Sequence, residues 1–94
     1  MATIDLPPIV MYARTTFCPD VTRSRGRLTE LELPWQELNV EEDPSLFAKV
    51  EELTGRRSVP TLVIGDSILV EPSNDELDAA LVKAGYTLNP DDEA

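Results

Sequence analysis

The segment Ile9–Asp20, with the sequence IVMYARTTFCPD, decides how the chain is interpreted. Its apolar start, Ile9–Ala13, predicts a β-strand, and Pro19 suits the first position of a helix, where its missing N–H is not needed. Cys18 is thus predicted to stand where a strand ends and a helix begins. The free N–H groups and the positive end of the helix dipole favour a thiolate there, the reactive form of cysteine. Cys18 is therefore a candidate nucleophile, and the alternative is a buried cysteine that acts as a small hydrophobe.

Six further elements are predicted along the rest of the chain from periodicity, turn residues and caps. The predicted helices span Pro19–Leu33, with Gly26 as a weak point, the stretch from Asp43-Pro44 to Gly55, and the stretch from the Ser73-x-x-Glu76 capping box to Gly85. The predicted strands span Trp35–Val40, Thr61–Ile64 and Ile68–Val70. The resulting order is β-α-β-α-β-β-α.

This order predicts an α/β fold with a central mixed sheet of four strands and helices on both faces. The first β-α-β unit should place its two strands in parallel with a right-handed crossover. Gly65-Asp66 is a two-residue turn typical of a β-hairpin, so the last two strands should be antiparallel. We expect one domain over residues 1–94, with flexible ends at 1–8 and 87–94.

Composition excludes several classes of function. The chain has 8 Lys and Arg against 18 Asp and Glu, a net charge of −10, which disfavours nucleic acid and anionic membranes as partners. It has no His, and its single cysteine excludes an intramolecular disulfide and a self-contained zinc site. No apolar run has the ~20 residues of a membrane span, and the N-terminus does not resemble a signal peptide. The expected location is cytoplasmic.

The arginines suggest a ligand. Six of the eight basic residues are arginines, and all are predicted to lie near Cys18 in the chain or at its end of the sheet: Arg14, Arg23, Arg25, Arg27, Arg56 and Arg57. Arginine side chains match carboxylates in geometry, so this arrangement favours a small anionic ligand. The alternative is ordinary surface ion pairs with acidic residues such as Asp20, Glu30 or Glu51.

Three blocks of sequence resemble the glutaredoxin branch of the thioredoxin-like superfamily. Cys18-Pro19-Asp20-Val21 is similar to the family's Cys-Pro-x-Cys, and the block from Gly55 to Pro60 (GRRSVP) is similar to its Gly-x-Arg-Thr-Val-Pro. The stretch Ile68–Leu81, which contains Glu71–Leu77 (EPSNDEL), resembles the ending of mycoredoxin-like members, which have an Asn-Pro-Ser-x-Asp/Glu stretch there. The three blocks occur in the right order, and the match spans about Ile9–Gly85.

The resemblance implies a thioredoxin-like fold and thiol–disulfide exchange. Cys18, supported by Pro19 and Asp20, would attack mixed disulfides between proteins and a low-molecular-weight thiol, which could be glutathione, mycothiol or bacillithiol. Pro60 would be a cis proline that faces Cys18, and the Val59 backbone would pair with the cysteinyl part of the thiol. The remaining thiol-binding residues implied by the resemblance are Arg14, Arg56 and Arg57 for carboxylates, and Ser73, Asn74 and Asp75 for the other end of the ligand.

The chain departs from the family at two points. Val21 replaces the second active-site cysteine, so no resolving thiol is present and only a monothiol route remains. The Gly-Gly pair expected before the last helix is also missing. The leading hypothesis is a monothiol oxidoreductase with an accessible, acidic Cys18. One alternative is a [2Fe–2S] cluster bridged by Cys18 of two chains and two external thiols, although Pro19 stands where such proteins have Gly. Another is a redox-silent module that binds a partner.

Overall fold

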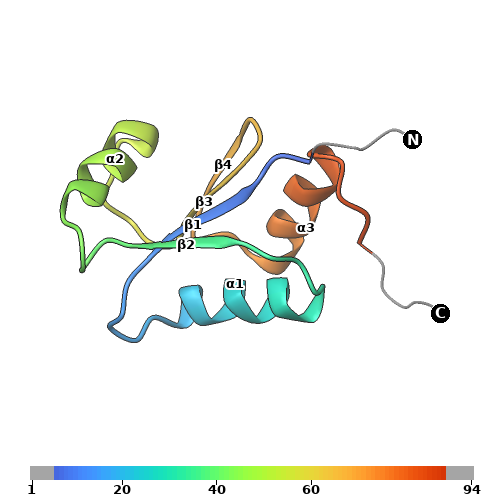
Figure 1. The fold of residues 1–94 in the computed structure, drawn as a ribbon, viewed down its shortest axis with the longest axis horizontal. Helices are drawn as coiled ribbons and strands as arrows, with labels where there is room; N and C mark the ends of the chain where they lie inside the picture. The colour runs from blue at the N-terminus through green and yellow to red at the C-terminus, as the bar shows by residue number, and fades with distance from the viewer. Residues whose placement is uncertain (1–5, 89–94) are drawn as a thin grey trace.

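The computed structural model describes residues 6–88 and contains the seven predicted elements (Figure 1). The four strands are β1 (Ile9–Ala13), β2 (Gln36–Asn39), β3 (Thr61–Ile64) and β4 (Ser67–Val70). The three helices are α1 (Pro19–Glu30), α2 (Ser45–Thr54) and α3 (Asn74–Lys83).

The strands form one mixed sheet in the order β2-β1-β3-β4. β1 and β2 are parallel, as the predicted β-α-β unit requires, whereas β3 is antiparallel to both β1 and β4. The predicted α/β class, strand directions and order of elements are confirmed. In this topology the C-terminal end of β1 and the N-terminal start of β3 lie at the same end of the sheet, since Tyr12 pairs with Thr61.

Alternation along the central strands divides the core into two layers, because successive side chains of a strand point to opposite faces. One layer combines alternate residues of β1, such as Met11, with residues of α1 and α3 such as Leu28 and Leu81. The other combines Tyr12 with residues of α2 such as Val50. Helices therefore cover both faces of the sheet, as predicted, with α1 and α3 on one face and α2 on the other (Figure 1).

The first helix ends three residues earlier than the predicted Pro19–Leu33. Glu32 has a φ of 59°, a left-handed conformation that interrupts the helix. Its N–H donates to the carbonyl of Thr29, and the N–H of Leu33 donates to the carbonyl of Leu28, each at 3.0 Å. This pair of bonds is a Schellman motif, which usually has glycine at the left-handed position. Glutamate here gives no sequence signal for the end of the helix.

Other boundaries shift by one residue. β2 is shorter than the predicted strand Trp35–Val40 by one residue at each end, and β4 includes Ser67 before the predicted Ile68. Residues 1–5 and 89–94 of the predicted flexible ends lie outside the described residues. Among the described ones, the Tyr86 hydroxyl donates a hydrogen bond to the carbonyl of Pro7. No helix within residues 6–88 is long and apolar enough to cross a membrane.

Candidate active site

Cys18 stands at the start of α1, at the junction that the sequence predicts. It is the N-cap residue, with extended backbone (φ −146°, ψ 115°), and its carbonyl accepts the first helical hydrogen bond from Thr22 at 3.0 Å. Pro19 begins the helix. Cys18 packs in the core layer that also contains Val21, and the residue is only 8% exposed. The expectation of an accessible cysteine is therefore wrong for this structure, because the helix start packs closely against the neighbouring loop.

That neighbouring loop contains Val59 and Pro60. The Cys18 Sγ atom lies 4.0 Å from the carbonyl oxygen of Val59, at the outer limit of a thiol hydrogen bond. The Val59–Pro60 peptide bond is cis, as the resemblance implied, and both residues are buried. The Thr61 hydroxyl donates to the carbonyl of Ser58 at 2.8 Å and closes the loop immediately before β3. The topology thus brings Cys18 to the residue before the cis proline, across 41 residues of sequence.

The start of α3 is joined to the same loop. The N–H of Glu71 donates to the carbonyl of Pro60 at 2.9 Å. Ser73 is the N-cap of α3, and the predicted capping box is present: its hydroxyl accepts from the Glu76 N–H, while the Glu76 carboxylate accepts from the Ser73 N–H. Asn74 and Asp75 form the exposed first turn. Their N–H groups precede the first helical hydrogen bond, so a helix end of this kind can bind an anion.

A braced loop, residues 14–17, leads into Cys18. The Glu41 carboxylate accepts hydrogen bonds from the N–H groups of Thr15 and Thr16, at 2.9 and 3.1 Å, and from the Thr16 hydroxyl at 2.7 Å. The Thr16 hydroxyl and backbone N–H lower the pKa of Glu41, because they stabilise its charged form. The Arg14 guanidinium donates to the carbonyls of Thr16 and Phe17, at 3.3 Å each. Phe17, directly before Cys18, is 74% exposed.

The six arginines do not all belong to this site. Arg25 pairs with Glu37 of β2, and Arg27 binds Asp78 of α3 through two hydrogen bonds at 2.8 and 2.7 Å. Both lie about two turns or more along α1 from Cys18, at 3.6 residues per turn. Their guanidinium groups form structural ion pairs, so the interpretation that all the arginines gather around the thiol is wrong for these two.

The two arginines before the cis proline differ in their surroundings. Arg57 donates to the Glu51 carboxylate of α2 at 3.0 Å and lies over the ring of Phe47, with 5.8 Å between the guanidinium carbon and the ring centroid. Arg56 is exposed, and its backbone bonds to the Thr54 hydroxyl at the end of α2. Of these two arginines, Arg56 therefore has the side chain less engaged with neighbouring residues.

Sequence reasoning missed Glu41 and did not single out Arg23 as a site residue. Glu41 lies 25 residues from Thr16, and nothing local links them. Arg23 had a signal, since it stands three residues after Asp20 and pairs with it at 2.9 Å. Its guanidinium also donates to the carbonyl of Pro72, directly before the N-cap of α3.

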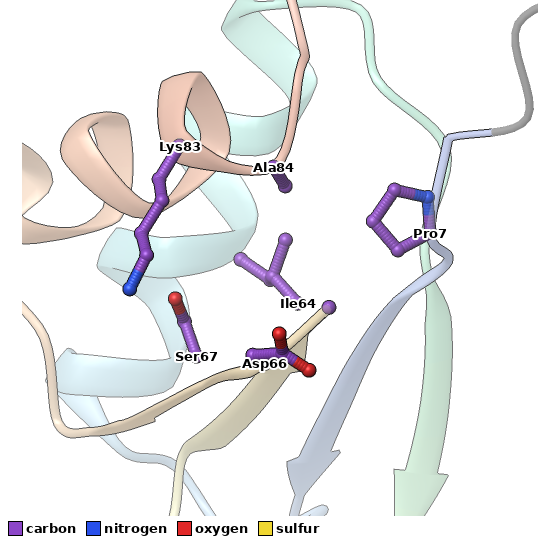
Figure 2. Close-up of a pocket in the computed structure, with 7 residues that line it drawn as sticks. Pro7, Ile64, Asp66, Ser67, Lys83 and Ala84 are labelled. Carbon is purple, nitrogen blue, oxygen red and sulfur yellow. The ribbon is translucent and has the colours of Figure 1, made fainter.

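The described residues also contain a surface pocket of about 250 Å³ away from Cys18 (Figure 2). The β3–β4 turn, the end of α3 and Pro7 line it, with Lys83 beside Ser67 (Figure 2). The pocket and Pro60 lie at opposite ends of the sheet, because Pro60 precedes β3 and Ile64, which lines the pocket, is the last residue of β3. Within residues 6–88, no group of three or more His, Cys, Asp or Glu side chains could hold a metal ion.

The sheet order β2-β1-β3-β4 with helices on both faces is the thioredoxin-like fold, and Cys18 lies at the start of its first helix, beside the loop that holds the cis proline. A family model described as glutaredoxin matches residues 9–69, which is more than half of the chain. The chain belongs to the glutaredoxin family. Members of this family are thiol–disulfide oxidoreductases that use glutathione-type thiols as co-substrates.

Solved structures agree on the fold. Glutaredoxin (grx-1) from Archaeoglobus fulgidus aligns with a TM-score of 0.71 and 24% identity, over 80% of this chain and 86% of that one. The glutaredoxin-like NrdH-redoxin of Escherichia coli aligns with a TM-score of 0.66 and 19% identity, over 77% and 92%. A buckwheat glutaredoxin–glutathione complex aligns with a TM-score of 0.64 and 22% identity, over 83% and 76%. No curated protein matches the sequence significantly.

Proposed function

We propose that the chain is a monothiol glutaredoxin that exchanges mixed disulfides between proteins and a low-molecular-weight thiol through Cys18. The observation that carries this proposal is the position of the Cys18 sulfur, at the start of α1 and 4.0 Å from the Val59 carbonyl beside the cis proline. This position places the sulfur at the N-terminal end of α1, where reactive cysteines are commonly found. The absence of a second cysteine at Val21 limits the chemistry to one protein thiol.

The proposed reaction has two exchange steps. In the first, the Cys18 thiolate attacks the small-thiol sulfur of a mixed disulfide, the S–S bond breaks, and the target protein leaves as a thiolate. In the second, a free small thiolate attacks the small-thiol sulfur of the Cys18 adduct. This step releases the Cys18 thiolate and the symmetric disulfide of the small thiol. Each step exchanges one disulfide for another, so electrons balance without any further oxidant.

The proposed ligand lies across the loop and the start of α3. Its cysteinyl part would pair with the Val59 backbone, and its carboxylates would meet Arg14 or Arg56. Its far end would lie at the exposed first turn of α3, residues 73–75. Arg57 would first have to break its ion pair with Glu51, so we expect it to contribute less to ligand binding than Arg14 or Arg56. Glutathione, mycothiol and bacillithiol all fit this scheme, and the resemblance of residues 71–77 supports the mycoredoxin-like branch. The second step needs a reduced thiol pool, so we propose the cytoplasm as the compartment.

The test measures adduct formation by intact mass after incubation with the disulfides of the three thiols. We expect the folded protein to take up one thiol, faster than a peptide of residues 14–21 does, and an excess of the free thiol to remove it. Cys18→Ser should take up none. In Val21→Cys the new thiol should attack the adduct, so that an internal disulfide replaces it.

Two outcomes would overturn the proposal. A folded protein that reacts no faster than the peptide with all three disulfides would favour a partner-binding module instead. A coloured protein after anaerobic reconstitution with iron, sulfide and thiol, combined with no adduct turnover, would favour the bridged [2Fe–2S] alternative.

A further inference from the structure

Arg23 connects the start of α1 to the start of α3. Its Nε and Nη2 atoms donate to the carbonyl of Pro72, at 3.3 and 3.0 Å, and its Nη1 atom lies 2.9 Å from the Asp20 carboxylate. The Arg23 and Asp20 side chains are each 37% exposed. Asp20 belongs to the first turn of α1, two residues after Cys18, and Pro72 is the residue before the α3 N-cap, Ser73. One side chain therefore bridges the two helix starts that border the candidate site.

Residues 71 and 72 are held from two sides. On the sheet side, the Glu71 N–H donates to the carbonyl of Pro60 at 2.9 Å. On the α1 side, Arg23 binds the carbonyl of the next residue, Pro72, which is buried. Together with the contact between Cys18 and Val59, these bonds close a ring that passes from α1 through the cis-proline loop to α3 and back to α1.

The backbone at Glu71 needs such support. Its φ is 49°, in the left-handed region, which is unfavourable for a residue other than glycine. The conformation of this segment therefore depends on contacts with its surroundings. Arg23 supplies two of the hydrogen bonds, both with a charged donor, and such bonds are stronger than those between neutral groups.

We infer that Arg23 is a positioning residue for the small thiol, a role that rests on the proposed function above. It touches neither Cys18 nor, in the proposed arrangement, the ligand. By holding Pro72, it sets where the N–H groups of Asn74 and Asp75 lie relative to the Cys18 sulfur. A ligand that spans from the sulfur to the start of α3 depends on that separation, whereas a short disulfide that reaches only the sulfur does not.

The first test compares two classes of substrate. One is the mixed disulfide of cysteine with whichever of glutathione, mycothiol or bacillithiol the wild type prefers, and the other is hydroxyethyl disulfide, which has no charged ends. Each reacts with the reduced protein in the absence of free thiol, so that kcat and KM describe formation of the Cys18 adduct alone and hydroxyethyl disulfide is not converted into a small-thiol mixed disulfide. In Arg23→Met, we expect the KM for the preferred mixed disulfide to rise about three- to tenfold, as for the loss of a charge-assisted hydrogen bond, with kcat changed little. The ratio of kcat/KM between the two substrates should fall accordingly, and Arg23→Lys should restore part of it.

The matched control is Arg25→Met. Arg25 lies on the same helix and loses an ion pair of similar exposure, but its partner is Glu37 of β2. The ratio of kcat/KM should stay at the wild-type value in this variant. Hydrogen exchange gives a readout independent of substrate: residues 74–77 should exchange faster in Arg23→Met than in Arg25→Met.

Four outcomes overturn the inference. Unchanged exchange at residues 74–77 would mean that Arg23 does not hold the start of α3. Equal losses on both substrates would mean that Arg23 acts on the fold or on the sulfur itself. A wild-type protein that reacts with none of the disulfides would refute the proposed function, and the positioning role with it. An active wild type, combined with an unchanged KM in Arg23→Met, would refute the positioning role alone.

Discussion

The ion pair between Arg27 of α1 and Asp78 of α3 should be a measurable part of the protein's stability. Two parallel hydrogen bonds join the guanidinium and the carboxylate, at 2.8 and 2.7 Å. The side chains are 24% and 26% exposed, so the pair lies between the exposed and the buried classes. Arg27 also pairs with Glu30 at 2.7 Å, but that carboxylate is 67% exposed and should contribute little.

The magnitude follows from this geometry. Exposed pairs contribute about 0.2–1 kcal/mol, and breaking a fully buried pair costs about 3–5 kcal/mol. We therefore expect a coupling free energy of about 1–2 kcal/mol between Arg27 and Asp78. For a domain of this size, each kcal/mol corresponds to about 4–8 °C in melting temperature. Loss of this coupling in Arg27→Met should lower the melting temperature by roughly 4–16 °C.

The assay is a double-mutant cycle of Arg27→Met and Asp78→Asn, measured by urea unfolding. The matched control is the cycle of Lys49→Met and Glu52→Gln, an ion pair at 3.6 Å within α2 whose side chains are 52% and 72% exposed. A coupling for Arg27 and Asp78 no larger than that of the control would refute the reasoning. It would show that this ion pair contributes no more to stability than an exposed pair does.

Three further changes test other parts of the structure. The depressed pKa of Glu41 stabilises the fold above the ordinary value of 4.5, and this contribution is lost as the pH falls through the lowered value. The urea midpoint of the wild type should thus exceed that of Glu41→Gln at pH 7, and the difference between the two midpoints should shrink towards pH 3. A difference that does not change with pH would contradict this. Ser73→Ala should cost about 1 kcal/mol in urea unfolding through loss of the α3 cap, and an unchanged midpoint would show that the cap is dispensable. Leu62→Ala, fully buried in β3, should cost about 2–5 kcal/mol, whereas Ile68→Ala, exposed on β4, should cost far less; equal losses would place the core elsewhere.

Much of the fold was predictable because its signals are local. The apolar run at Ile9–Ala13 predicts β1. Ser73 and Glu76, three residues apart, form the capping-box pattern that predicts the start of α3. Pro19 indicates a helix start, and it puts Cys18 at the N-cap. The cis bond before Pro60 came from the resemblance to the family, since one sequence without that resemblance does not reveal it.

The exceptions arise where local rules are overridden. Glu32 adopts a left-handed backbone where glycine is the usual residue, so the early end of α1 has no sequence signal. Cys18 is nearly buried because a loop 41 residues away packs against it. Neither fact follows from the residues nearby.

The sequence by itself determined which elements form, which residue carries the single thiol and that the chain has no second cysteine. Those features depend on residues within a few positions of one another, or on composition. Only the tertiary structure decided which distant residues the charged groups bind. Arg23 meets Pro72 across 49 residues, Arg27 meets Asp78 across 51, and Glu41 reaches Thr16 across 25. An acidic chain offers each arginine many carboxylates, and only the packing of helices and sheet determines which one is within hydrogen-bonding distance.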